Sequence, residues 1–269
     1  MQIIKNIADL DSFHRQAKKE NLKTAFIPTM GALHDGHLKL VEEGLKHSDR
    51  AIVSIFVNPT QFAPHEDFDS YPRTIEADCQ KLESVGAHAV WLPTVADIYP
   101  NGQETDIHID GVSEPLEGEF RPHFFDGVAT VVARLLRAVK PDVAMFGEKD
   151  FQQLQVVKKM VVQEGIPVDI IGVQIVRDHN GLALSSRNAY LSESDYESAI
   201  QLNQILVQLA QNMITEKEAV HLLLDSGFDK VDYCVQRNSE TFGTENPNRV
   251  LAAAWIGKTR LIDNMPMGV

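Results

Sequence analysis

The sequence has only two cysteines, Cys79 and Cys234, which lie far apart and form no CxxC pair. This scarcity gives no support to a disulfide framework or a cysteine zinc site, so both thiols are expected to be reduced. Long apolar runs are also lacking, because no stretch approaches the roughly 18 apolar residues that a membrane-spanning helix needs. The first residues, MQIIKNIADL, have no apolar core of signal-peptide length. We therefore expect a soluble, cytoplasmic protein with no membrane partner.

Basic residues are in the minority, with 25 Lys and Arg against 38 Asp and Glu, and the formal net charge is -13. This charge repels the phosphate backbone of nucleic acid, so nucleic acid is not expected to be a partner. Apolar residues are plentiful, at 43% of the 269 residues, which is enough to build a sizeable core. The length exceeds that of a usual single domain and favours two unequal domains.

Continuous apolar runs indicate strands that are buried on both faces of a parallel sheet. The runs lie at 24–28, 51–57, 87–92, 142–146 and 168–177, and helical patterns separate them at about 37–47, 73–85, 126–139 and 151–164. The alternation predicts an α/β fold with a Rossmann-like, doubly wound parallel sheet. In such a sheet the ligand site lies at the carboxyl ends of the strands, where the loops at 58–72 and 110–127 are expected to leave it.

The pattern changes after residue 176. Helices are predicted around 193–213 and 216–225, and short strands near 231–236 and 249–254. We therefore predict a boundary between a Rossmann-like domain, residues 1–176, and a smaller C-terminal α+β domain, residues 177–269.

The stretch PTMGALHDGHLKL (28–40) follows an apolar run and opens an amphipathic one. Its glycines have the G-x-x-x-x-G spacing of a P-loop, but His37 and Leu38 stand where the lysine and the serine or threonine belong. The glycines still let the backbone approach a ligand, and free amides at a helix start attract an anion. We therefore predict an anion site that His34 and His37 flank from one side of the first helical turn.

Two other interpretations of this stretch remain open. A zinc site would need a third ligand, and the candidates His14, His47 and His65 lie in unrelated patterns. The other interpretation is an ordinary turn with surface histidines, since glycine and histidine are common where loops begin.

Two more segments offer polar groups near the same edge of the sheet. FVNPTQF (56–62) exposes Gln61, a neutral amide that can bind a hydroxyl or carboxylate, although a proline turn with a solvated glutamine also explains it. GLALSSRN (181–188) offers two hydroxyls and a guanidinium to a polyphosphate, and it lies where a loop between domains can close over a nucleotide. A turn with a helix cap and a surface arginine is the alternative for this segment.

The segment MFGEKDFQQL runs from a strand into a helix. Lys149 can neutralise a phosphate, Asp150 can accept from ribose hydroxyls, and Gln153 can face the same crevice one turn further on. Asp150 is alternatively a simple helix N-cap. Four such loops at one sheet edge are unlikely to be independent accidents, and together they predict a nucleotide site.

Together these motifs resemble the pantoate–β-alanine ligase family of the nucleotidylyltransferase superfamily, whose mark is HxGH, here residues 34–37. The resemblance covers nearly the whole chain, through PTMGALHDGH, VSIFVNPTQF, YPRT, GVATVV, FGEKDFQQL, GLALSSRN and AAAWIGKTRLIDN. HxGH alone marks only the superfamily, whereas its combination with NPTQF, GEKD and SSRN is specific to the family. One loop departs, because the family commonly has RPGHF before GV. Here it reads RPHFFDGV, with His123, Phe124 and Asp126 replacing the usual types.

The resemblance implies a set of site residues. It implies ATP contacts at Met30, Gly31, Ala32, Leu33, His34, Asp35, Gly36, His37, Gly147, Glu148, Lys149, Asp150, Val176, Leu184, Ser185, Ser186 and Arg187. It also implies pantoate contacts at Gln61 and Gln153, β-alanine near Gln61, and a proton-donor role for His37. The N-terminal domain would then bind ATP and pantoate while the C-terminal domain closes over them, and the assembly would be a homodimer.

The implied reaction is the ATP-dependent condensation of pantoate with β-alanine, which yields pantothenate, AMP and pyrophosphate through a pantoyl-adenylate. Charge grows on the oxygen that leaves with pyrophosphate, and preorganised donors can stabilise it. The candidate catalytic donors are His34, His37, Lys149, Ser186 and Arg187. Mg²⁺ is expected to accompany the ATP phosphates, and no ligand for it can be assigned, with Asp78 only a weak candidate.

Three other functions would share part of this pattern. A nucleotidylyltransferase that stops after the first displacement would retain AMP in its product. A class I aminoacyl-tRNA synthetase shares the HxGH logic, but the short chain and the charge of -13 argue against it. A nonenzymatic ATP-sensing module would explain the phosphate loops without any chemistry, but not the paired glutamines on the acceptor side.

Overall fold

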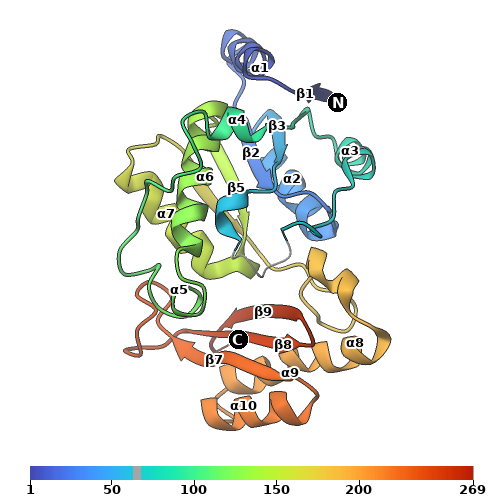
Figure 1. The fold of residues 1–269 in the computed structure, drawn as a ribbon, viewed down its shortest axis with the longest axis vertical. Helices are drawn as coiled ribbons and strands as arrows, with labels where there is room; N and C mark the ends of the chain where they lie inside the picture. Colours follow the sequence, from blue (N-terminus) through green and yellow to red (C-terminus); the bar gives the residue numbers. More distant parts are fainter. Residues whose placement is uncertain (63–67, 269) are drawn as a thin grey trace.

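The structure, a computed structural model, describes residues 1–62 and 68–268. Its larger, N-terminal part is built on one sheet in which every pair of neighbouring strands is parallel (Figure 1). The strand order is β1-β4-β3-β2-β5-β6. The strands are β1 (Gln2–Ile4), β2 (Thr24–Thr29), β3 (Arg50–Ile55), β4 (Ala89–Trp91), β5 (Val143–Gly147) and β6 (Asp169–Val173). The predicted doubly wound α/β fold is confirmed.

Helices cover both faces of this sheet. The longer elements are α1 (Ile7–Lys19), α2 (Asp35–His47), α3 (Ile75–Ser84), α6 (Phe124–Val139) and α7 (Phe151–Gln163), and the shorter ones are α4 (Val95–Ile98), α5 (Glu117–Phe120), η1 (Pro59–Gln61) and η2 (Glu148–Asp150). Phe26 of β2 packs in the core with α1, α6 and α7, whereas its neighbours Ala25 and Ile27 pack in the core with α2 and α3. Alternate side chains of a strand point to opposite faces, so burial on both faces makes the apolar runs continuous.

The C-terminal part, drawn below the parallel sheet in Figure 1, contains a second sheet of three antiparallel strands. Its elements are η3 (Ser186–Tyr190), α8 (Glu193–Ala199), α9 (Gln201–Ala210), α10 (Glu216–Asp225), β7 (Lys230–Arg237), β8 (Arg249–Ile256) and β9 (Thr259–Pro266). Leu206 of α9 and Leu223 of α10 share one buried core with Ala252 of β8. The predicted α+β architecture of the C-terminal part, with helices packed on a small sheet, is confirmed.

Some boundaries differ from the prediction. The helix predicted at 193–213 is interrupted at Ile200, between α8 and α9, although Ile200 keeps helical dihedral angles of -63° and -22°. Strands β1 and β9 and helix α1 were not predicted. The predicted boundary at residue 176 follows the end of β6 at Val173. The division into two separate domains stays a prediction.

None of the helices in the described part of the chain is long and apolar enough to cross a membrane. Both cysteines are free. Cys234 lies in the core of the C-terminal part, and burial raises the pKa of its thiol to about 12. A thiol with that pKa stays protonated and unreactive at neutral pH, in agreement with a structural role.

Candidate active site

The carboxyl ends of β2 and β5 lie side by side where the order of the strands reverses, which is the position at which doubly wound sheets bind ligands. A cavity of about 230 Å³ opens there. It is lined by most of the predicted site residues, namely Met30, His34, Gly36, His37, Gln61, Gly147, Lys149, Asp150, Gln153, Val176, Leu184, Ser185, Ser186 and Arg187. The four loops that follow the predicted strands therefore share one cavity. Of the predicted residues, Gly31, Ala32, Leu33, Asp35 and Glu148 do not line it.

The two histidines stand at the start of α2, with ring centroids 4.1 Å apart. His34 Nδ1 accepts the backbone N–H of Gly36 at 3.1 Å, and His37 Nδ1 accepts the backbone N–H of His34 at 3.3 Å. A ring nitrogen that accepts a hydrogen bond carries no proton, so a neutral imidazole held in this way has its proton on Nε2. The local backbone therefore turns both rings into Nε2–H donors.

Both histidines are neutral at pH 7. Burial, followed by the neighbouring Lys149 ammonium, lowers the pKa of His34 from 6.5 to about 4. Burial, followed by His34 and Lys149, lowers the pKa of His37 to about 3. Desolvation disfavours the charged form of an imidazole, and a nearby cation acts in the same direction. The site thus presents two uncharged donors beside one ammonium group.

The turn that carries the histidines is held from behind by Asp78, which is fully buried. Its carboxylate accepts the backbone N–H groups of Ala32 at 3.0 Å and Leu33 at 2.8 Å, and the hydroxyl of Thr74 at 3.2 Å. Gly31 has a φ of +87°, a conformation that glycine adopts without strain. The structure therefore gives Asp78, which the sequence offered only as a weak candidate for a magnesium ligand, the role of a loop anchor.

Gln61 lies at the end of η1 and is oriented by Asn58, a residue that sequence reasoning missed. Asn58 is 1% exposed, and its Nδ2 donates to Gln61 Oε1 at 3.1 Å and to the Gly127 carbonyl at 3.3 Å. Its Oδ1 accepts the Tyr99 hydroxyl at 2.6 Å. Gln61 Nε2 also contacts Met30 Sδ at 3.0 Å. A buried asparagine next to a proline is the only signal in the sequence that could have revealed this role.

The GEKD turn holds a cation and an anion together. Lys149 Nζ lies 3.3 Å from Asp150 Oδ2, and both side chains line the cavity. Asp150 occupies the N-cap position of α7, but its side chain makes no capping hydrogen bond. Asn264 of β9 donates from Nδ2 to the carbonyls of Glu148 and Lys149, each at 2.9 Å. Asn264 thus fixes the turn from the C-terminal part, and no local pattern in the sequence indicates that contact.

The two adjacent glutamines of α7 have different surroundings. Gln153 lines the cavity, as predicted. Gln152 is buried, and its Nε2 donates to the carbonyls of Val112 at 3.0 Å and Pro115 at 2.6 Å. Its Oε1 accepts the backbone N–H of Glu117 at 3.1 Å. Gln152 therefore holds the loop that leads into α5, while Gln153 is left for a ligand.

The SSRN segment meets the HxGH stretch across the cavity. The Ser186 hydroxyl donates to the Ala32 carbonyl at 3.0 Å and thereby joins two segments that are 154 residues apart. Ser185 Oγ accepts the backbone N–H of Arg187 at the start of η3. Arg187 lies with its guanidinium carbon 5.8 Å from the centre of the Tyr71 ring.

The RPHFFDGV loop, which departs from the family pattern, has an unusual backbone. His123 stands where the family has glycine, and its φ is +67°. A left-handed conformation costs a residue with a Cβ roughly 1–2 kcal/mol. Further on, a Cβ built on Gly127 would lie 2.6 Å from the carbonyl oxygen of Thr60, so α6 approaches η1 more closely than any other residue would allow.

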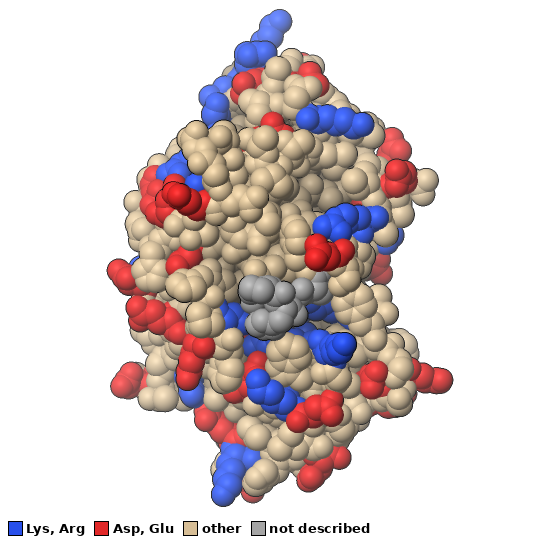
Figure 2. All heavy atoms as spheres, in the orientation of Figure 1, with Lys and Arg blue, Asp and Glu red and all other residues tan. Residues whose placement is uncertain are grey.

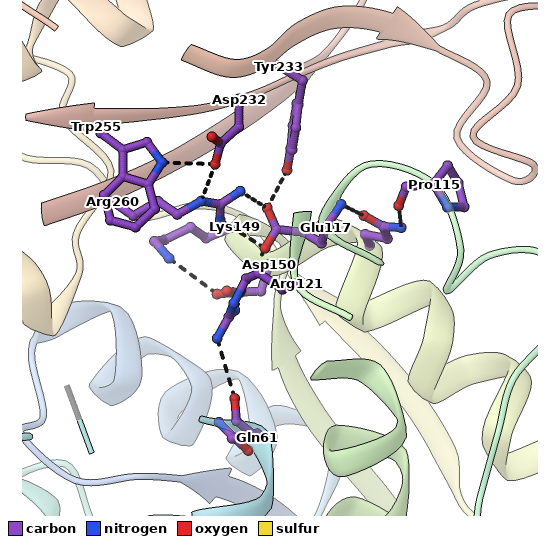
Figure 3. Close-up of polar contacts among 11 residues, drawn as sticks. Gln61, Pro115, Glu117, Arg121, Lys149, Asp150, Asp232, Tyr233, Trp255 and Arg260 are labelled. Carbon is purple, nitrogen blue, oxygen red and sulfur yellow. Dashed lines mark hydrogen bonds and ion pairs between the residues drawn. The ribbon is translucent and has the colours of Figure 1, made fainter. Parts of the chain in front are cut away.

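A second cavity, of about 890 Å³, opens between the N-terminal and C-terminal parts and shares Gln61, Lys149 and Gln153 with the first. On the face shown in Figure 2, Lys and Arg atoms gather near the middle of the molecule, between these two parts. A buried ion pair joins the two parts of the chain. Arg260 of β9 contacts both carboxylate oxygens of Glu117 in α5, at 2.7 and 2.9 Å (Figure 3). Sequence reasoning gave no signal for this pair.

A cluster of potential metal ligands lies on the surface, apart from the histidine turn. Within residues 1–62 and 68–268, one group of histidine and carboxylate ligands is close enough to hold an ion, namely His108, Asp110 and Glu114 on the surface. This group includes neither His34 nor His37. His65, one of the candidates for a third zinc ligand, lies outside the described residues, as does part of the predicted loop at 58–72.

The sequence and the structure of the chain both match those of known proteins. The family model described as pantoate-beta-alanine ligase matches residues 2–266. The chain belongs to the pantoate-beta-alanine ligase family. It is therefore an enzyme with pantothenate synthetase activity, the ATP-dependent ligation of pantoate and β-alanine. The predicted family, activity and ATP-binding α/β fold are confirmed.

Relatives within the pantoate-beta-alanine ligase family span the whole chain. The pantothenate synthetase of Caulobacter vibrioides is 46% identical over 280 residues, covering 99% of this chain and 98% of its own. That of Stenotrophomonas maltophilia is 49% identical over 264 residues, covering 93% and 94%. A crystal structure of the Francisella tularensis ligase, complexed with beta-gamma ATP and β-alanine, matches with a TM-score of 0.89 at 37% identity, covering 99% of this chain and 97% of its own.

Proposed function

We propose that this enzyme forms the amide in two steps, through a bound pantoyl-adenylate, and releases pantothenate, AMP and pyrophosphate. The observation that carries the proposal is that one cavity brings together two kinds of group. Its lining contains the two neutral imidazole donors and Lys149, which suit phosphate, and also Gln61 and Gln153, whose neutral amides suit hydroxyls and a carboxylate. A carboxylate is a poor acyl donor, and adenylation gives it a good leaving group.

ATP occupies the side of the cavity that lies at the start of α2. Its contacts come from the predicted segments Met30–His37, Gly147–Asp150 and Leu184–Arg187, together with Val176. Segment 30–37 presents a helix N-terminus, which attracts phosphate oxygens. The relative from Francisella tularensis, solved with an ATP analogue and β-alanine, supports binding of the same two substrates by this chain.

In the first step, the pantoate carboxylate attacks the α-phosphorus, and the bond between that phosphorus and the bridging oxygen breaks. Negative charge grows on the departing pyrophosphate. The Nε2–H groups of His34 and His37 and the charges of Lys149 and Arg187 stabilise it, because they are in place before the charge develops. His37 acts as a neutral donor, which is consistent with its low pKa. Ser186 contributes by holding the Ala32 carbonyl, and with it the histidine turn.

In the second step, the neutral amine of β-alanine attacks the acyl carbon of the adenylate. A carbon–nitrogen bond forms, the bond from the acyl carbon to the AMP oxygen breaks, and the nitrogen loses a proton. Gln61 lies in both cavities, so it can contact pantoate from one side and β-alanine from the other. Gln153 holds pantoate from the start of α7.

Mg²⁺ fits this site as a companion of ATP. The described part of the cavity lining offers mainly N–H donors and the carboxylate of Asp150, so the ion would be held by phosphate oxygens and water, with Asp150 as the available protein ligand. When bound, it neutralises charge on the phosphates. Assembly as a homodimer and a cytoplasmic location are further proposals that rest on the family resemblance.

Isotope exchange tests the adenylate-first order. Pantoate should support the exchange of labelled pyrophosphate into ATP with no β-alanine present, because every first-step group belongs to the cavity before the amine arrives. AMP should accumulate only once β-alanine is added. An absolute need for β-alanine in the exchange, in a preparation that makes pantothenate, would refute the two-step order.

A further inference from the structure

The end of the Gln61 amide that faces the cavity is fixed by its neighbours. Gln61 Oε1 accepts from Asn58 Nδ2 at 3.1 Å, so the amide oxygen is turned toward Asn58. Gln61 Nε2 lies 3.0 Å from Met30 Sδ, and both residues line the cavity at the ends of the strands. A side-chain amide has two N–H donors, and a thioether sulfur is only a weak acceptor. Gln61 therefore offers the cavity a hydrogen-bond donor.

Asn58 sets this orientation because both ends of its own amide bond to backbone groups. Its Nδ2 donates to the Gly127 carbonyl at 3.3 Å, and its Oδ1 accepts the Thr60 backbone N–H at 3.3 Å. A carbonyl can only accept and a backbone N–H can only donate, so the Asn58 amide cannot turn around without losing both bonds. Asn58 must therefore present its N–H groups to Gln61.

The shortest hydrogen bond of the Asn58 side chain comes from a distant part of the chain. The Tyr99 hydroxyl donates to Asn58 Oδ1 at 2.6 Å, across 41 residues of sequence, and it also lies 3.0 Å from the Thr60 hydroxyl. Thr60 belongs to η1, as Gln61 does, so its bonds to Asn58 cannot hold η1 against the rest of the protein. Tyr99 and Gly127 lie on other elements and therefore fix Asn58 from outside.

Tyr99 is placed to act as a fixed donor. It directly follows α4, whose first turn is closed by reciprocal hydrogen bonds between Thr94 and Asp97, and it is 4% exposed. The guanidinium carbon of Arg134 lies 4.7 Å from the centre of its ring. Burial outweighs this cation and raises the pKa of the Tyr99 phenol, so the hydroxyl keeps its proton. Tyr99 is not one of the described residues that line the two cavities, so its effect on a substrate has to pass through η1 and Asn58.

We propose that Tyr99 is a positioning residue for pantoate, which acts through Asn58 to keep the N–H end of Gln61 directed into the cavity. Gln61 then binds pantoate by donating to one of its oxygen atoms and does not accept from its hydroxyl groups. This proposal rests on the proposed function, because it takes pantoate as the ligand of Gln61. It adds to that function the direction of the hydrogen bond and the residue that fixes this direction.

Tyr99→Phe removes the hydroxyl and keeps the buried ring. The KM for pantoate should rise about 3- to 10-fold, within the range expected for one neutral hydrogen bond, while the KM for ATP changes less than about twofold. Tyr196→Phe is the matched control, because the Tyr196 hydroxyl donates to Asp178 at 2.7 Å, and it should leave the KM for pantoate unchanged. If Tyr99→Phe raised the KM for pantoate no more than that for ATP, the proposal would be overturned.

Gln61→Glu tests the direction of the bond. One carboxylate oxygen can still accept from Asn58, but the other stands where the N–H group stood and cannot donate. The KM for pantoate should therefore rise at least as much as in Gln61→Ala. A KM near the wild-type value would mean that Gln61 accepts from pantoate, and it would overturn the proposed direction.

A double-mutant cycle separates positioning from a general structural defect. In the Gln61→Ala background, Tyr99→Phe should raise the KM for pantoate by less than about 1.5-fold, because the group that Tyr99 positions is gone. The same rise in both backgrounds would show that Tyr99 acts on the structure alone and would overturn the proposal. If Tyr99→Phe does not fold by circular dichroism, Tyr99→Met, which fills most of the same volume without a hydroxyl, takes its place in the cycle. A wild-type KM for pantoate in Gln61→Ala itself is a separate result, which would refute the pantoate site of the proposed function and this proposal with it.

Discussion

His34 and His37 are held by backbone N–H groups on Nδ1, and each ring therefore has one possible neutral tautomer with its proton on Nε2. Burial keeps both rings uncharged well below neutral pH. A donor that is already neutral and oriented needs no protonation or reorganisation when charge develops on a phosphate oxygen. At the scale of the residue, the backbone of one helix turn thus determines the chemistry of two side chains.

Removal of one of these donors should affect the first step most. We expect His37→Ala to slow single-turnover adenylate formation by about 10² or more, the scale measured when one preorganised transition-state donor is lost. His47→Ala is the matched control, because His47 is exposed at the other end of the same helix. Near-normal adenylation by a folded His37→Ala variant would contradict the role.

The lowered pKa values also predict how stability depends on pH. Folded His37 has a pKa of about 3, against 6.5 for the free side chain, so between these values the unfolded chain binds a proton that the folded chain does not. Above pH 6.5 the ring is neutral in both states, so it does not change the free energy of unfolding. Below pH 6.5 the free energy of unfolding falls, by up to about 2 kcal/mol at pH 5. Urea unfolding at pH 7 and pH 5 should show a smaller loss for His37→Gln than for the wild type. Equal losses would show that His37 is not neutral in the folded chain.

At the scale of the element, Gln61 depends on how closely α6 approaches η1. Gly127 in the first turn of α6 lies against the Thr60 carbonyl, and Asn58 bonds to both Gly127 and Gln61. Asn58 and Gly127 are 69 residues apart in the sequence, yet a single missing side chain sets the distance between their elements. The orientation of the Gln61 amide, which we propose to bind substrate, therefore depends on a residue of a different helix.

We expect Gly127→Ala to push η1 outward, since the added Cβ would lie 2.6 Å from a backbone oxygen that cannot rotate away. The free energy of unfolding should fall by about 1–3 kcal/mol, the usual cost of overpacking, and the KM for pantoate should rise more than that for ATP. Gly243→Ala serves as the control, because its Cβ would meet only the side-chain ends of Thr241 and Glu245. A larger effect on ATP than on pantoate would argue against this coupling.

A strand could be predicted from the sequence when apolar side chains fill both of its buried faces, and it was missed when polar side chains are buried in it. Strands β2 to β6 are covered on both faces and leave continuous apolar runs, so their existence was predicted. Strand β9, TRLIDNMP, mixes buried polar residues with apolar ones, because Asp263 and Asn264 bond to partners elsewhere in the chain, and it was missed. The HxGH, GEKD and SSRN loops were locatable because their own residues face the cavity. Glu117, Gln152 and Asn264 were not, because their partners lie far away in the sequence.

At the scale of the whole molecule, polar contacts join β9 to the segment that follows β6, to the GEKD turn and to α5. Arg177 forms two hydrogen bonds with the buried carboxylate of Asp263, at 2.6 and 2.8 Å. Asn264 holds the GEKD turn, and Arg260 pairs with Glu117. Two successive residues of β9 thus join the connecting segment to the turn that carries Lys149. Glu117, Arg260, Asp263 and Asn264 also line the larger cavity.

The Asn264→Asp substitution tests whether β9 holds the GEKD turn, and it hardly changes the shape of the side chain. The amide that donates to two carbonyls becomes a carboxylate that repels them, while its other oxygen keeps the Arg249 guanidinium as a partner and gains charge attraction to it. The repulsion outweighs this gain, so the free energy of unfolding should fall by about 1 kcal/mol or more, and the KM for ATP should rise as Lys149 shifts. Asn101→Asp makes the same chemical change at an exposed position and should do neither. Calorimetry and steady-state kinetics at pH 7 measure both effects, and wild-type values for Asn264→Asp would show that β9 does not hold the turn.

The position of Asn264 near the end of the sequence also has a consequence for synthesis. The parallel sheet, with its histidines and the GEKD turn, can form while the chain is still growing, since domains made first fold first. The groups that fix the turn from the other side are made more than a hundred residues later, on β9. We therefore expect a growing chain on the ribosome to lack the contacts that fix the GEKD turn until translation has passed Asn264.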